Sequence, residues 1–386
     1  MDDLRNELNE RRRRGLYRVR RRLQSAQGAH IRYRGRNFIS FSSNDYLNYS
    51  SDPRLARAAA RSARRYGCGA GASALVSGHL PPLRALERAI AAWQGVDAAI
   101  VFSSGYAANL AVLSALAGPE DAVFSDELNH ASLIDGCRLS RAAIQVYRHC
   151  DVSHLGELLR KQTSRVRRRI IATDTVFSMD GDSAPLKELL ALAERYDCLL
   201  LVDEAHATGV LGEQGTGLTG TLPTSVGERN RIVHVGTLSK ALGSQGGFVC
   251  GPKLLVEWLV NAARPYIFST ALAPPLAAAA RRAVALVQAE PERRRHLLRL
   301  AELLRDRLSA VGVDASRSTS QIVPVIVGPA RDAMMLSRRL EERGLLVPAI
   351  RPPSVAEGTA RLRISVSAGH TENEIIQLAA TLGECR

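Results

Sequence analysis

Lysine is scarce in this 386-residue sequence, which makes Lys240 the first candidate for chemistry. The chain has 52 lysine and arginine residues, and its lysines are Lys161, Lys187, Lys240 and Lys253. An arginine guanidinium stays protonated in a protein and cannot form or exchange an imine, whereas a lysine amine can do both. In the segment Thr237-Leu238-Ser239-Lys240, two hydroxyl side chains beside the amine could bind a phosphate group.

Asp203 and His206 form a second candidate pair, placed directly after the apolar run 199–202. As metal ligands they would need two more ligands, and the surrounding sequence does not supply them. A carboxylate can instead pair with the protonated nitrogen of a pyridine ring and keep that ring an electron sink. A hydrogen-bonded structural pair is a third explanation, and the two residues alone leave all three open.

Two further polar motifs also follow short apolar runs. Ser103-Ser104-Gly105-Tyr106 follows residues 99–102 and precedes a predicted helix at 107–116. A glycine at a helix start lets backbone amides approach a phosphate, and the helix dipole favours the anion. An ordinary N-cap at Ser103 or Ser104 would explain the same motif. His130, in Asn129-His130-Ala131-Ser132, follows the apolar run 122–125.

Short strands that alternate with helices must position these residues. Such strands are predicted at 99–102, 122–125, 144–147, 170–173, 199–202, 232–235 and 247–250. Short, mostly apolar runs are typical of strands covered on both faces by helices, so the pattern indicates a mainly parallel α/β sheet. Ligands bind beyond the carboxyl ends of the strands in such a sheet. The four candidate motifs are therefore expected to meet at one edge.

The two ends of the chain have a different pattern. Residues 1–26 are predicted to form an arginine-faced helix, followed by an extended stretch to residue 41. Long helices are predicted at 271–290 and 293–308, strands at 322–327 and 361–366, and helices at 333–343 and 373–382. We therefore expect an N-terminal segment at 1–47, a large α/β domain at 48–285 and a small α+β domain at 286–386.

The formal net charge of +14 comes mostly from the N-terminal end, where residues 1–36 contribute +8. A charge-dense leader is more often a solvated helix or a partner-docking arm than a polynucleotide site, and no zinc-finger spacing or basic zipper accompanies it. We expect no nucleic-acid partner. No apolar run is long enough to span a membrane, no secretory signal is recognisable, and the six cysteines are scattered, so we expect a cytoplasmic protein.

Taken together, these motifs resemble the α-oxoamine synthases from about Arg20 to the C-terminus. These are fold-type-I pyridoxal-phosphate transferases with a large, mainly parallel seven-stranded sheet domain and a small C-terminal α+β domain. The resemblance rests on Ser43-Asn44-Asp45-Tyr46-Leu47, Ser104-Gly105-Tyr106, His130-Ala131-Ser132-Leu133, Val176-Phe177-Ser178-Met179-Asp180-Gly181, Asp203-Glu204-Ala205-His206 and Thr237-Leu238-Ser239-Lys240-Ala241-Leu242-Gly243. One departure is Asn48, which stands where the family usually has glycine.

The resemblance implies a role for each matched residue and no metal ligand. Lys240 would carry pyridoxal 5'-phosphate and move the substrate's α-proton, and His130 would stack on the ring and assist at the acyl carbonyl. Asp203 would pair with the ring nitrogen and His206 with the ring hydroxyl. The remaining cofactor contacts would be Gly105, Tyr106, Thr237 and Ser178, with Ser269 and Thr270 reaching the phosphate in the neighbouring chain of a homodimer. The substrate contacts would be Arg20, Asn44, Ser354 and Arg363.

The reaction implied is the decarboxylative condensation of L-alanine with a pimeloyl thioester, as in the branch of the family that serves biotin synthesis. The segments Arg351-Pro352-Pro353-Ser354 and 358–363 favour that branch. The acyl carrier, coenzyme A or acyl carrier protein, stays open. A sister synthase that uses glycine or serine with another acyl-CoA is the alternative. A non-catalytic or nucleic-acid-binding protein on this fold is more remote, because the set of Asp203, His206 and Lys240 is intact.

Overall fold

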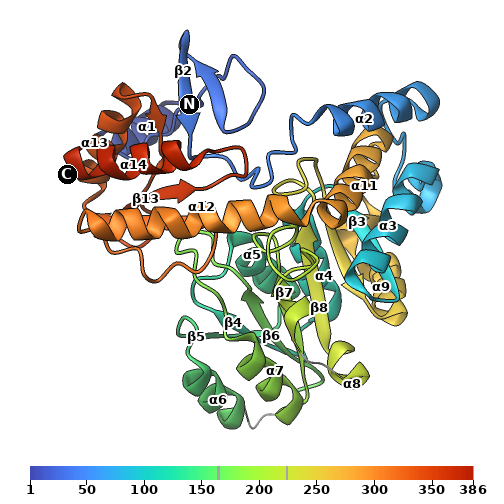
Figure 1. The fold of residues 1–386 in the computed structure, drawn as a ribbon. Coiled ribbons are helices and arrows are strands. Elements are labelled where there is room, and N and C mark those ends of the chain that lie inside the picture. The colour runs from blue at the N-terminus through green and yellow to red at the C-terminus, as the bar shows by residue number, and fades with distance from the viewer. Residues whose placement is uncertain (163–165, 223–224, 386) are drawn as a thin grey trace. The chain divides into compact units, whose positions relative to one another are not determined.

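The computed structural model describes residues 1–162, 166–222 and 225–385, and the chain divides into two units (Figure 1). The larger unit comprises Tyr49–Ser178 and Ser183–Arg294, and the smaller one Met1–Asn48, Met179–Asp182 and Arg295–Arg386. The N-terminal segment belongs to the smaller unit because its strand β2 (Arg36–Ser40) pairs in parallel with β11 (Leu345–Leu346). None of the helices in the described part of the chain is long and apolar enough to cross a membrane.

A seven-stranded sheet in the order β3-β9-β8-β7-β6-β4-β5 forms the centre of the larger unit. Strand β9 runs antiparallel to both of its neighbours, and the other pairs are parallel. The predicted mainly parallel seven-stranded sheet is therefore confirmed. Its strands are β3 (Ala98–Phe102), β4 (Ala122–Asp126), β5 (Ala143–Tyr147), β6 (Arg169–Asp174), β7 (Cys198–Asp203), β8 (Ile232–Thr237) and β9 (Gly247–Gly251).

Apart from the edge strand β5, in which Ile144 and Val146 are exposed, the apolar strands are buried on both faces, which explains why they lack a polar alternation. In β4, Val123 packs into one core cluster, whereas Ala122 and Phe124 pack into the other. In β7, Leu201 belongs to the first cluster and Leu200 to the second. Successive side chains of a strand point to opposite faces, so a strand between two helical layers must be apolar throughout.

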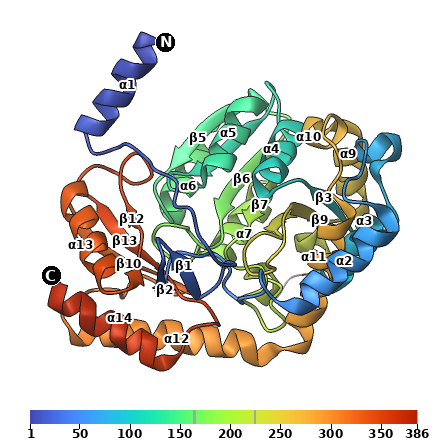
Figure 2. The same cartoon turned by 90° about the horizontal axis from the view of Figure 1, so that it is seen from above.

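Helices cover each face of this sheet (Figure 2). The first core cluster contains residues of α4 (Gly105–Leu116), α5 (Ala131–Ser140), α9 (Lys253–Ala262) and α10 (Arg264–Ile267). The second contains residues of α6 (Val152–Lys161) and α7 (Leu186–Arg195). The larger unit also has α2 (Pro53–Tyr66), α3 (Pro81–Gln94), α8 (Val226–Arg229) and α11 (Pro274–Ala289).

The smaller unit contains two three-stranded sheets. One has the order β10-β13-β12 and is antiparallel, and the other has the order β1-β2-β11. The helices and strands predicted between residues 271 and 382 are all present. The elements are β1 (His30–Tyr33), β10 (Ile322–Gly328), β12 (Ala349–Ile350), β13 (Ala360–Ser365), α1 (Asp2–Arg13), α13 (Ala330–Glu342), α14 (Glu372–Cys385) and the part of α12 (Pro291–Ala310) from Arg295 on.

The prediction of one helix over residues 1–26 is wrong, because α1 ends at Arg13. Gly15 follows with a φ of +66°, a left-handed conformation that ends helices and that glycine adopts without strain. No residue of α1 is buried, so the helix has no apolar face packed on the rest of the chain that would stabilise further turns. Asn48 has a φ of +54°, which explains how asparagine can replace glycine there, since it tolerates this region better than most residues.

Candidate active site

Lys240 lies in a tight loop just after β8, beyond the carboxyl end of that strand. Its Nζ is 2.9 Å from Nε2 of His206, which is buried in the turn after β7. The loop closes through a hydrogen bond from the amide of Gly243 to the carbonyl of Lys240. Gly243 has a φ of +60°, and a Cβ there would lie 2.5 Å from the amide nitrogen of Ser50. Glycine is therefore required for the loop that presents the lysine amine.

Asp203 ends β7 and is buried, with its carboxylate fixed by two donors. Oδ2 accepts a hydrogen bond of 2.6 Å from Nδ2 of Asn109, and Oδ1 accepts one of 2.8 Å from the amide of Ala205. The metal-pair explanation of Asp203 and His206 does not fit this geometry, because His206 Nε2 faces an amine that would repel a cation. The arrangement leaves a carboxylate and an amine at one edge of the sheet.

A chain of hydrogen bonds links Asp203 to His130, the residue that precedes α5. Asn109 Nδ2 also donates to Ser132 Oγ at 2.8 Å, and that hydroxyl lies 2.7 Å from His130 Nδ1. Nδ1 accepts from the Ser132 amide as well, so the proton of the neutral imidazole is on Nε2. The protein around the imidazole lowers the pKa of His130 by desolvation, and Lys240 lowers it further against the opposing effect of Asp203. His130 is therefore neutral at pH 7.

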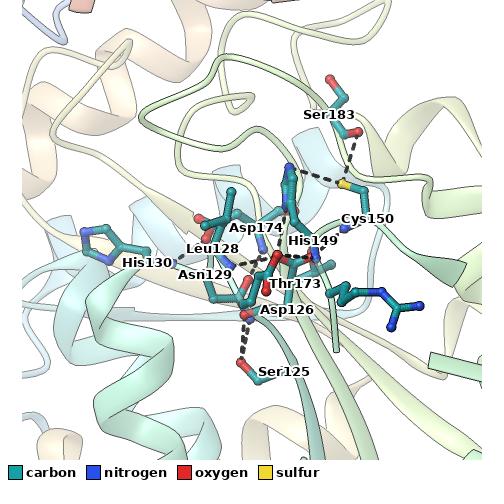
Figure 3. Close-up of polar contacts among 12 residues, drawn as sticks. Ser125, Asp126, Leu128, Asn129, His130, His149, Cys150, Thr173, Asp174 and Ser183 are labelled. Atoms are coloured by element: carbon teal, nitrogen blue, oxygen red, sulfur yellow. Dashed lines mark hydrogen bonds and ion pairs between the residues drawn. The ribbon is translucent and has the colours of Figure 1, made fainter. Parts of the chain in front are cut away.

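Asp174, at the end of β6, fixes the backbone of His130 (Figure 3). Its Oδ2 accepts a hydrogen bond of 2.6 Å from the His130 amide, and its own amide donates to Asn129 Oδ1. Burial, and then the charge of Asp203, raise the pKa of Asp174 well above its usual range. The sequence analysis missed Asp174 and Asn109. The signal for Asn109 was its spacing of one helical turn from Gly105, on the same face of α4.

The backbone is unusually close at the N-terminus of α4, where a phosphate was predicted to bind. A Cβ on Gly105 would touch the Thr237 side chain at 3.4 Å, and a Cβ on Gly247 would lie 2.5 Å from the backbone of Gly105. Ser104 caps the helix by accepting from the Ala107 amide at 3.1 Å, so the ordinary N-cap is also present. Helix amides, glycines and the Thr237 hydroxyl together fit an anion such as a phosphate.

No hydrogen bond described above links the remaining predicted cofactor residues to Lys240 or Asp203. These residues are Tyr106, Ser178, Ser269 and Thr270. The exposed Tyr106 ring is edge-on to His130, with ring centroids 6.4 Å apart. Ser178 is half-buried beyond Phe177. Ser269 is half-buried and Thr270 exposed, and Thr270 forms an isolated β-bridge with Ser73 of its own chain. The roles of these four residues stay predictions.

Two of the four predicted substrate residues lie together in the smaller unit. Arg363, on β13, is buried, and its Nη1 donates to Asn44 Oδ1 at 3.1 Å and to Ser365 Oγ at 2.8 Å. Its Nη2 is 3.4 Å from the Tyr46 hydroxyl. Arg20 is exposed in the stretch after α1, and Ser354 is exposed after the β12 strand.

Ser354 also lines a groove of about 1160 Å³ in the smaller unit. The groove has a strongly basic wall, with Glu341 and Glu342 as its acidic residues. Its arginines are Arg12, Arg18, Arg21, Arg34, Arg36, Arg338 and Arg351. A surface of this kind attracts anionic ligands.

Fold and site together define a transferase of the fold-type-I pyridoxal-phosphate class, and the chain belongs to the aminotransferase class I and II family, whose model matches residues 36–382. It is 50% identical over 379 residues to the 8-amino-7-oxononanoate synthase of Alkalilimnicola ehrlichii, covering 98% of this chain and 96% of the relative. The enzyme of that name from Anaeromyxobacter dehalogenans (strain 2CP-1) is 49% identical, covering 95% and 91%. The predicted family is confirmed.

Among solved structures, the chain is similar to serine palmitoyltransferase (SPT) with PLP as an internal aldimine. The TM-score is 0.92 at 31% sequence identity, and the alignment covers 100% of this chain and 96% of the other. The predicted fold is thus confirmed along the whole chain. The two relatives from Alkalilimnicola and Anaeromyxobacter are closer in sequence than SPT, whereas a solved 8-amino-7-oxononanoate synthase from Francisella tularensis is 30% identical with a TM-score of 0.77, covering 90% of this chain and 97% of the other.

Proposed function

We propose that this chain condenses L-alanine with a pimeloyl thioester and releases 8-amino-7-oxononanoate, carbon dioxide and the free thiol carrier, a step of biotin biosynthesis. The observation that carries the proposal is the identity of 49–50% over nearly the full length to enzymes of that name. SPT, with nearly the same fold, is 31% identical. A fold does not by itself define a substrate, so the sequence distance is the discriminating quantity.

The cofactor of this reaction is pyridoxal 5'-phosphate, which when bound supplies a ring that accepts the electron pair of the substrate's α-carbon. Lys240 would hold it through Nζ and would accept the α-proton of the alanine. Asp203 would keep a proton on the ring nitrogen, and Asn109 holds the Asp203 carboxylate in position. The amides at the start of α4, with Gly105 and Thr237, would bind the phosphate, and Ser178 and Tyr106 would complete the cofactor contacts.

His206 and His130 have distinct tasks in this proposal. His206 lies beside the Lys240 amine and would donate to the ring hydroxyl. His130 is neutral because of its lowered pKa, so it can lie against the ring and direct its Nε2 proton to the acyl carbonyl oxygen. A protonated imidazole would repel the Lys240 ammonium, which is one reason why a lowered pKa suits this position.

The substrate groups have matching partners in the smaller unit. Arg363 is already oriented by Asn44 and Tyr46, and its planar guanidinium can pair with the alanine carboxylate through two parallel hydrogen bonds. The arginine-lined groove beside Ser354 would bind the anionic carrier of the thioester. Arg20 lies in sequence between Val19 and Arg21, which both line this groove. Coenzyme A and acyl carrier protein are both anionic, so the groove fits either carrier.

A product assay tests the proposal. The holoenzyme is incubated with alanine, glycine or serine, each combined with pimeloyl, acetyl, succinyl and palmitoyl thioesters on coenzyme A and, for pimeloyl, on acyl carrier protein. The highest kcat/KM is expected for alanine with a pimeloyl thioester. A methyl group in a pocket discriminates by roughly 10–200-fold, so slow turnover of glycine is compatible. A preference for glycine or serine with another acyl group would assign the chain to a sister activity.

The proposal also includes a homodimer in which each chain completes its neighbour's site, and a cytoplasmic location. Phe268, Ser269 and Thr270 support the first point, since Phe268 is a large apolar side chain that is 71% exposed in the isolated chain. Aromatic residues are enriched in the cores of protein–protein interfaces, so a neighbouring chain would cover this side chain in the proposed dimer.

A further inference from the structure

A second cluster of reactive side chains lies outside the site described so far. Asp126 ends β4, and His149 and Cys150 follow β5, its neighbour in the sheet. His149 Nδ1 is 3.0 Å from Asp126 Oδ1, and Cys150 Sγ is 3.7 Å from His149 Nε2 (Figure 3). One ligand atom from each of the three residues lies within 4.8 Å of the others. The imidazole is thus between a carboxylate and a thiol.

The cluster is held rigidly by its surroundings. The Asp126 carboxylate is buried and accepts hydrogen bonds from the amides of Leu128 at 2.9 Å and Cys150 at 2.8 Å. The His149 ring packs edge-on against Phe177, with ring centroids 4.4 Å apart. The His149 side chain is 20% exposed and Cys150 is half-buried, so an ion can reach both from solvent.

We propose that His149 Nε2 and Cys150 Sγ bind a zinc ion. With bond lengths of about 2.0–2.1 Å to nitrogen and about 2.3 Å to sulfur, tetrahedral coordination places the two atoms about 3.6 Å apart. The observed 3.7 Å agrees with that separation without any rearrangement. The thiol donates to the carbonyl oxygen of Ser183 at 3.9 Å, and zinc binding would release the thiol proton to solvent. That carbonyl oxygen would then be the third ligand and water the fourth.

Asp126 is not a zinc ligand in this site but positions the ligand His149. Its contact with Nδ1 fixes the imidazole tautomer so that Nε2 is the atom free of a proton and directed at the metal, an arrangement common around zinc-bound histidines. A thiolate with an imidazole selects zinc over magnesium or calcium, which prefer oxygen ligands. The inference does not depend on the proposed function, because none of these residues takes part in the condensation.

Calorimetric titration of the holoenzyme with zinc, after removal of trace metals by a chelator, tests the site. One strong binding event per chain is expected for the wild type. Cys150→Ser and His149→Ala should abolish it, and Asp126→Asn should weaken it by about 10–100-fold. Cys68→Ser is the matched control, because Cys68 is an exposed thiol away from the cluster, and it should leave binding unchanged.

Thiol labelling gives a second measurement that needs no variant. The rate at which iodoacetamide alkylates each cysteine is measured by peptide mass spectrometry. Zinc should lower the alkylation rate of Cys150 and leave the alkylation rate of Cys68 unchanged. Unchanged Cys150 labelling at saturating zinc, or a Cys150→Ser protein that binds zinc as tightly as wild type, would overturn the proposal. A wild type without a stoichiometric binding event would do the same.

Discussion

At the scale of single residues, the short distance between Lys240 Nζ and His206 Nε2 has a direct chemical meaning. Two basic nitrogens 2.9 Å apart can share one proton but disfavour two positive charges. A lysine amine must lose its proton to attack a carbonyl group, and His206 Nε2 is close enough to accept that proton. The scarcity of lysine had made Lys240 one of four candidates, and its position after the apolar run 232–235 distinguished it from the others.

We predict that borohydride reduction of the yellow holoenzyme fixes the cofactor on the peptide containing Lys240, as read by mass spectrometry. Lys240→Arg keeps the positive charge but cannot form the bond, so it should give no fixed label and no turnover. Lys187→Arg and Lys253→Arg are the matched controls and should behave as wild type. Label on Lys187 or Lys253 would contradict the assignment of Lys240.

Asn109 should matter for turnover although it carries no charge and cannot exchange a proton. Asn109→Leu removes the hydrogen bond to the Asp203 carboxylate, and hydrogen bonds to charged groups contribute about 1.5–3 kcal/mol. We expect kcat/KM to fall about 10–100-fold, with the fold retained. Asn261→Ala, an exposed asparagine on α9, is the control. Equal kinetics for both variants would remove Asn109 from the site.

At the scale of helices and strands, the site depends on the close approach of α4 and β9. Burial on both faces made most of the seven strands predictable, because each is a short, mostly apolar run. The edge strand β5 is exposed and contains Gln145. The two-residue strands β11 and β12 carry no such pattern and were not predicted. Asp174 could not be found from sequence either, since its role depends on which strand ends the sheet brings together, whereas the spacing of Asn109 from Gly105 was a signal that the sequence analysis did not use.

Gly247→Ala should loosen the binding of the cofactor phosphate. The new Cβ would lie 2.5 Å from the Gly105 backbone, so β9 and the start of α4 must move apart. We expect the cofactor dissociation constant, from a spectroscopic titration, to rise at least about tenfold. Gly118→Ala is the control, because its Cβ would meet no atom closer than 3.8 Å. Unchanged affinity in Gly247→Ala would mean that the approach of β9 has no role in binding.

His370, before α14, should make the smaller unit sensitive to acid. It is buried and stacked on Phe41, and its ring nitrogens bond to Ser367 and Ser40. Burial lowers the pKa of His370 to about 4, against the opposing effect of Glu374. In the unfolded chain the His370 side chain is protonated below about pH 6.5, whereas in the folded chain it is protonated only below about pH 4. The free energy of unfolding therefore falls as the pH drops from about 6.5 to about 4.

His370→Gln tests this effect. The variant should be less stable than wild type at pH 7.5, and the difference in unfolding free energy should narrow by about 2–3 kcal/mol at pH 4.5, because glutamine takes up no proton. Denaturant unfolding at both pH values measures the difference. A difference that stays constant with pH would show that His370 keeps an ordinary pKa in the folded protein.

At the scale of the whole molecule, the proposed shared sites predict complementation between inactive variants. Lys240→Ala damages the site that contains the lysine, whereas the double change of Ser269 and Thr270 to alanine damages the neighbour's site. A mixed dimer collects both lesions in one site and leaves the other whole. Random pairing at equal amounts should recover at most roughly a quarter of wild-type activity. A mixture proven to contain mixed dimers, yet without recovered activity, would mean that each chain builds its site alone.

The pairing of β3 has a consequence for how the protein is made. Among the described residues, β3 at the sheet edge pairs with β9 and with no other strand, although residues 98–102 leave the ribosome long before residues 247–251. Contacts between distant segments form late, and their partners stay exposed until then. A nascent chain therefore presents an unpaired strand next to Gly105 through much of its translation. Cofactor loading must wait until Lys240 and β9 have emerged, and the unpaired strand is open to aggregation during that interval.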